Sequence, residues 1–142
     1  MNENKYVLLK NYIKSNIAPI LIDDIGDLEL PNCVILSSKC PREELNGHYE
    51  NVNFVPPKWY QDLLCFDGCS ILIIDRIDLI SKDEQTKFIE ILKYRQVSTF
   101  ELPKNTIIIV TAKESIINED VYSFVVDIRG RIWILMQLKE KC

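Results

Sequence analysis

Asp75 follows directly on four apolar residues, Ile71 to Ile74, and a second carboxylate, Asp78, comes three residues later. Such a run favours a strand that is buried on both faces, as in a parallel sheet covered by helices. Proteins built in this way bind ligands at the edge of the sheet where the strands end. Because carboxylate oxygens suit Mg²⁺, Asp75 and Asp78 are the candidate metal ligands of this chain.

Each of these residues also has a structural interpretation. An aspartate at the end of a strand can cap the next helix or pair with a basic neighbour, here Arg76. Asp78 is also an ordinary turn residue. The cysteines do not favour a zinc site, because no C-x-x-C pair occurs and Cys33 lies within an apolar run.

The remaining elements alternate between strand and helix patterns. Apolar spacing predicts a helix over residues 4–15, a helix after Pro56-Pro57, and a third helix that begins with a capping box at Ser81 and Glu84. The predicted strands are Pro19 to Ile22, Cys33 to Leu36, Ile71 to Ile74, Thr106 to Thr111 and Phe124 to Ile128. Residues 131–142 form either an edge strand or a terminal helix.

This alternation predicts a single α/β domain over residues 1–142. Crossover helices between parallel strands give a three-layer sandwich with a mainly parallel, five-stranded sheet. A chain of 142 residues can bury a substantial core but has no room for a second domain.

Composition excludes several classes of partner. The net charge of −4 does not suit nucleic-acid binding, which needs a basic stripe. No apolar run reaches the roughly 20 residues of a membrane span. The polar start, Met1 to Lys14, does not resemble a secretory signal. We therefore expect a cytoplasmic protein that binds neither nucleic acid nor membrane.

The stretch from Pro56 to Ile128 resembles the middle of an AAA+ ATPase domain of the MoxR type. The matching features are Pro-Pro-Lys-Trp-Tyr-Gln-Asp-Leu-Leu before a glycine, a Walker B-like strand ending in Asp75, Leu-Pro-Lys-Asn at 102–105, and the strand leading to Thr111-Ala112. In the family this last strand carries the sensor-1 residue. The resemblance implies a P-loop NTPase-like fold, with ATP and Mg²⁺ as cofactors if the domain is active.

Five departures from the family pattern argue against activity. The loop after the first strand, where G-x-x-x-x-G-K-[ST] would bind phosphate, reads Asp23-Asp24-Ile25-Gly26-Asp27-Leu28-Glu29. Its carboxylates would repel a triphosphate. Arg76 replaces the Walker B glutamate, Lys113 is the nearest match to the sensor-1 asparagine, Ser123 stands where an arginine finger is expected, and the chain ends without the helical lid.

We therefore expect a catalytically silent AAA+-like domain, without cofactor, that acts through protein contacts. The expected partner is an active AAA+ subunit or a second copy of this chain, and the apolar residues 131–138 are a candidate contact surface. Two alternatives remain. One is an ATPase completed by another subunit. The other is a receiver-like, Mg²⁺-dependent phosphoacceptor domain, because Asp23-Asp24, Asp75 and Thr111-Ala112 also resemble that family.

Overall fold

A computed structural model describes residues 19–23 and 32–129 of the chain. Three features of the sequence lie outside this part: the helix predicted over residues 4–15, most of the acidic loop at 24–29, and the segment 131–138. The strand and helix boundaries below therefore concern the central part of the chain, which includes the whole Walker B-like region.

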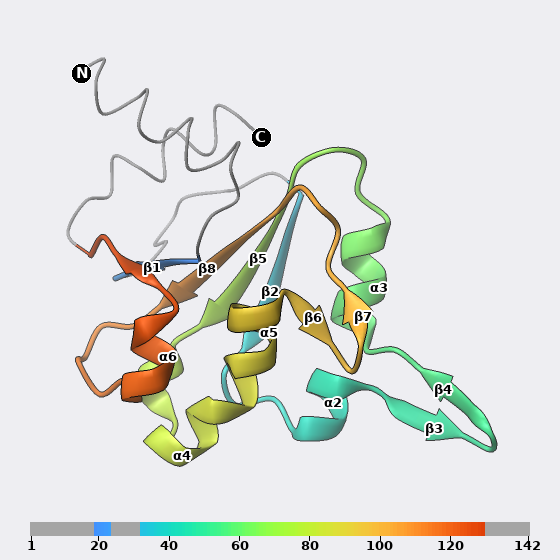
Figure 1. Ribbon diagram of the computed structural model, residues 1–142, viewed down its shortest axis with the longest axis horizontal. Coiled ribbons are helices and arrows are strands. Elements are labelled where there is room, and N and C mark those ends of the chain that lie inside the picture. Colours follow the sequence, from blue (N-terminus) through green and yellow to red (C-terminus); the bar gives the residue numbers. More distant parts are fainter. Residues whose placement is uncertain (1–18, 24–31, 130–142) are drawn as a thin grey trace.

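The core of the described structure is a five-stranded, all-parallel sheet (Figure 1). Its strands, in spatial order, are β2 (Cys33–Ser37), β5 (Ser70–Asp75), β8 (Thr106–Thr111), β1 (Ile20–Ile22) and β9 (Val126–Asp127). The five predicted strands and the α/β class are thus confirmed, and the sheet is wholly parallel.

Alternation along the strands divides the core into two clusters. Leu72 and Ile74 of β5 contribute to one cluster, whereas Ile71 and Ile73 contribute to the other. All four side chains are fully buried, with 0% of their surface exposed. This explains the uninterrupted apolar run, because a central strand of a parallel sheet has no solvated face.

The helices are short. They are α2 (Arg42–Asn46), α3 (Lys58–Leu64), α4 (Lys82–Gln85), α5 (Ile89–Tyr94) and α6 (Glu119–Ser123), with 3₁₀ turns η1 (Ile77–Leu79) and η2 (Thr86–Phe88). The buried apolar residues of α2, α3, α5 and α6 all belong to the cluster that contains Leu72 and Ile74. Ser81 caps α4 by accepting from Glu84 N at 3.2 Å, as predicted. The expected single helix after Ser81 is nevertheless interrupted by η2, whose Phe88 is fully buried. No described helix is long and apolar enough to cross a membrane.

Two antiparallel hairpins were not predicted from the sequence. The first joins β3 (His48–Glu50) to β4 (Asn53–Val55) and projects away from the sheet beside α2 (Figure 1). The second joins β6 (Gln96–Val97) to β7 (Phe100–Glu101). Their strands are too short to show a clear alternating pattern, which is why the sequence gives only weak signals for them.

Candidate functional site

The strand order brings the predicted site residues to one edge of the sheet. Ser37 pairs in register with Asp75, and Ile22 pairs with Thr111. After β1 the chain goes to β2 on one side of the sheet, whereas after β8 it goes to β9 on the other side. The ends of β8 and β1 therefore flank a topological switch point, the place where open α/β sheets bind ligands.

Asp75 is tied to the neighbouring strand through Thr111. The Thr111 hydroxyl donates to Asp75 Oδ1 at 3.1 Å and accepts from the backbone N–H of Arg76 at 2.7 Å. Thr111 is fully buried. The Thr111 hydroxyl thus provides a hydrogen-bond partner for both the Asp75 carboxylate and the backbone N–H of Arg76.

The Arg76 backbone adopts a left-handed conformation, with φ 57° and ψ 60°. For a residue other than glycine this conformation costs roughly 1–2 kcal/mol, so surrounding contacts must hold it. The Ser38 hydroxyl donates to Arg76 O at 2.6 Å, and Thr111 accepts from Arg76 N. The backbone of Arg76 is therefore fixed from both neighbouring strands.

The Arg76 side chain forms a bidentate salt bridge with Asp78. Nε lies 2.9 Å from Asp78 Oδ1 and Nη2 lies 3.0 Å from Oδ2, while Glu114 N donates to Oδ2 at 3.1 Å. The Asp78 side chain is only 1% exposed. The hydrogen bonds from Arg76, opposed in part by burial, lower the pKa of Asp78 below its usual value. The charge of the Asp78 carboxylate, a predicted metal ligand, is thus balanced by the Arg76 guanidinium.

The other residues named by the resemblance lie at nearby but separate places. Lys113 is exposed two residues beyond Thr111, and it is Thr111 that contacts Asp75. Ser123 ends α6, where its hydroxyl donates to Asp120 O at 2.6 Å. A hydroxyl at the end of a parallel strand was available as a signal, but Thr111 and Lys113 could not be distinguished as partners of Asp75 without the structure.

A second ion pair, between Asp127 and Arg129, lies at the same edge of the sheet, at the end of β9. At the end of β9, Arg129 Nη2 lies 2.8 Å from Asp127 Oδ2 and Nε lies 3.0 Å from Oδ1, and Tyr122 OH donates to Oδ2 at 2.9 Å. The hydrogen bonds from Arg129 lower the pKa of Asp127 to about 2. The Arg129 guanidinium is therefore engaged in an ion pair with Asp127, two residues earlier in the chain.

Metal binding at this edge stays a prediction. Among the described residues, no group of three or more His, Cys, Asp or Glu side chains is arranged to hold a metal ion. Asp75 and Asp78 have different hydrogen-bond partners, Thr111 for the first and Arg76 with Glu114 for the second. The contacts described here hold both carboxylates in fixed positions at the end of β5.

We expect the Thr111→Val substitution to destabilise the protein by about 1–3 kcal/mol, because an isosteric side chain leaves Arg76 N–H and Asp75 without their partner. Thr111→Ser is the matched control, since it keeps the hydroxyl and loses one methyl group, at a cost of about 1 kcal/mol. Urea unfolding at pH 7 measures both. Equal losses for the two variants would show that the hydroxyl contributes nothing.

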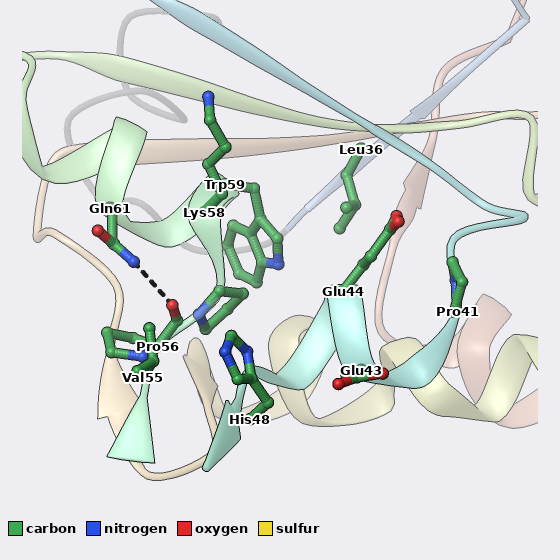
Figure 2. Close-up of a pocket in the computed structure, with 11 residues that line it drawn as sticks. Leu36, Pro41, Glu43, Glu44, His48, Val55, Pro56, Lys58, Trp59 and Gln61 are labelled. Atoms are coloured by element: carbon green, nitrogen blue, oxygen red, sulfur yellow. Dashed lines mark hydrogen bonds between the residues drawn. The ribbon is translucent and has the colours of Figure 1, made fainter. Parts of the chain in front are cut away.

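A groove lies away from this edge, beside α2, α3 and the β3–β4 hairpin. Its volume is about 680 Å³ (Figure 2). Trp59 and Leu36 form its apolar interior, and Glu43 and Glu44 of α2 face it from the opposite side. Trp59 is fixed because its Nε1 donates to Leu45 O at 2.9 Å. The Trp59 side chain is nevertheless largely buried, since the residue is only 6% exposed.

The chain matches no protein-family model and no curated protein.

Proposed function

We propose that this chain is a catalytically silent AAA+-like domain that acts through contacts with other proteins. The observation that supports this proposal most strongly is the position of Arg76 and the contacts that hold it. Arg76 occupies the position where the family places the water-orienting glutamate of Walker B, and both its backbone and its guanidinium are held by neighbouring residues. A guanidinium cannot act as a base at neutral pH.

The order of the strands supports an AAA+-like fold. Counted along the chain, the five parallel strands lie in the order 2-3-4-1-5. P-loop NTPases of the AAA+ group have this order, with the sensor-1 strand between the first strand and the Walker B strand. Here β8, which ends in Thr111, lies between β1 and β5.

The same order argues against the receiver-like alternative. Receiver domains have the order 2-1-3-4-5, in which the first strand lies next to the third. In this chain β8 separates β1 from β5, so Asp23 and Asp75 end strands about 10 Å apart. The acidic pair and the phosphoacceptor of a receiver domain need adjacent strands, and we therefore rank this alternative last.

Protein contact is supported by exposed apolar side chains on the β3–β4 hairpin. Tyr49 is 73% exposed and Val52 is 90% exposed. The hairpin projects from the domain (Figure 1), and its residues His48 and Val55 line the same groove as Trp59 (Figure 2). Exposed apolar residues on a projecting element favour contact with another protein, either a second copy or an active AAA+ subunit.

The remaining alternative is an active ATPase that another subunit completes. We expect no release of phosphate from Mg-ATP by the chain above the rate of a heat-denatured sample, because Arg76 replaces the base. A continuous phosphate assay with wild type and Asp75→Asn tests this. Turnover by the wild type that Asp75→Asn abolishes would contradict the proposal and support an active site at this edge.

A further inference from the structure

The groove beside α2, α3 and the β3–β4 hairpin has an apolar interior and one acidic wall. Its apolar lining residues are Leu36, Pro41, Val55, Pro56, Pro57 and Trp59. Glu43 and Glu44, both exposed, line the groove from the first turn of α2 (Figure 2). The groove thus offers a ligand both apolar contact and negative charge.

The charge of the acidic wall is not balanced within the groove. Among the described residues, neither the Glu43 nor the Glu44 carboxylate has a hydrogen-bond or ion-pair partner. Lys58 also lines the groove, but its side chain extends away from α2 (Figure 2) and its Nζ lies 3.5 Å from Asp62 Oδ2. Arg42, the basic residue of α2, is not among the lining residues. Two carboxylates are therefore available to a cation that enters the groove.

Contacts between its walls fix the shape of the groove. Trp59 Nε1 donates to Leu45 O at 2.9 Å, and this buried hydrogen bond joins α3 to α2. On the hairpin, the Phe54 ring stacks on Phe100 of β7, with 5.7 Å between the ring centroids. Because these walls are already in place in the free chain, a ligand would bind without the cost of ordering them.

We propose that this groove binds a basic, apolar peptide segment of another protein, in which a lysine or arginine stands beside an aliphatic or aromatic side chain. The apolar side chain contacts the surface formed by Trp59 and Leu36, and the cation lies against Glu43 and Glu44. Apolar contacts of this kind supply most of the affinity of an interface, whereas complementary charge selects the partner. The inference rests on the proposed role in protein contacts, and it names the chemistry of the partner.

Other occupants fit the groove less well. Nucleic acid would bring phosphate charge against Glu43 and Glu44. A second copy carries the same net charge of −4, and the hairpin that it could insert has Glu50 between the exposed Tyr49 and Val52. Like charges on the two surfaces disfavour such a contact. Charge complementarity therefore favours a basic segment of a different protein.

Selection of phage-displayed random peptides on the full chain tests the proposal. We expect wild type to enrich peptides that carry lysine or arginine beside an aliphatic or aromatic residue. Fluorescence anisotropy then measures the affinity of a labelled synthetic copy of an enriched peptide. Glu43→Gln/Glu44→Gln should weaken this affinity roughly tenfold, because two exposed ion pairs are lost.

The matched control is Asp83→Asn/Glu84→Gln. Asp83 and Glu84 also form an exposed acidic pair in the first turn of a helix, α4, but they do not line the groove. This double variant loses the same net charge and should bind the peptide as wild type does. In NMR spectra of wild type, the peptide should shift the amide signals of Glu44, His48 and Val55, and leave those of Asp83 and Glu84 unchanged.

Several results would overturn the proposal. One is the absence of any peptide enriched above selection on a blank support, and another is enrichment of peptides without a basic residue. Equal weakening by the two double variants would show that net charge, not the groove, sets the affinity. A wild-type dimer in sedimentation that Glu43→Gln/Glu44→Gln alters would make a second copy the occupant. Catalytic silence is judged separately, because only turnover in the phosphate assay contradicts it.

Discussion

Arg76→Ala is expected to destabilise the protein by about 3–5 kcal/mol, the cost of leaving a buried carboxylate without its counter-ion. The Asp78 side chain is 1% exposed, and its carboxylate accepts two hydrogen bonds from the Arg76 guanidinium and one from Glu114 N. Urea unfolding at pH 7 measures the loss. If Arg76 were a solvated surface residue, the substitution would change the free energy of unfolding by less than about 0.5 kcal/mol.

The control for this prediction is the double variant Arg76→Ala/Asp78→Asn. An amide carries no charge into the core, so the double variant should be more stable than Arg76→Ala alone.

The stabilisation from the Arg76–Asp78 pair depends on pH, and the sign of this dependence follows from the pKa of Asp78. The folded-state pKa of Asp78 is lowered, so its contribution is present above the unfolded value and is lost as the pH falls through the folded value. The difference between wild type and Arg76→Ala should therefore shrink with falling pH.

Gly47→Ala should also cost about 3–5 kcal/mol. Gly47 has φ 88° and ψ −175°, a region that is essentially restricted to glycine. A Cβ atom there would lie 2.5 Å from Val55 O and 2.9 Å from Phe54 Cζ. Backbone strain and overpacking each contribute about 1–3 kcal/mol. The substitution would also displace the β3–β4 hairpin, because Gly47 joins α2 to β3.

Gly68→Ala is the matched control for Gly47→Ala. Gly68 also has a positive φ, 75°, but an added Cβ would meet nothing within 4 Å. Only the backbone strain of about 1–2 kcal/mol then remains. Thermal or urea unfolding of the two variants compares them directly. Equal losses would show that contacts of the added Cβ atom with Val55 and Phe54 contribute nothing to the destabilisation by Gly47→Ala.

The sheet was predictable from sequence because its strands carry strong local signals. Ile71 to Ile74 and Thr106 to Thr111 are uninterrupted apolar or β-branched runs, and such runs occur in strands that are buried on both faces. The α4 cap was predictable for the same reason, since Ser81 and Glu84 satisfy a local rule. The break at η2 was not predictable, because it depends on how Phe88 enters the core.

The candidate site was predictable in its location but not in its contacts. Asp75 and Arg76 were identified from the end of a strand and from the departure at Walker B. The Arg76–Asp78 pair was not, because it forms around the left-handed backbone of Arg76. The contact of the Thr111 hydroxyl was not, because it depends on the strand order. Thr111 is 36 residues from Asp75 along the chain, and only the pairing of β5 with β8 brings them together.

The most direct test of the central claim is calorimetric titration of the full chain with Mg-ATP. We propose that contacts within the protein hold the edge of the sheet at Asp75 and that this edge binds no triphosphate. We therefore expect no binding heat for wild type or for Asp75→Ala. Micromolar binding by the wild type that Asp75→Ala weakens would contradict it.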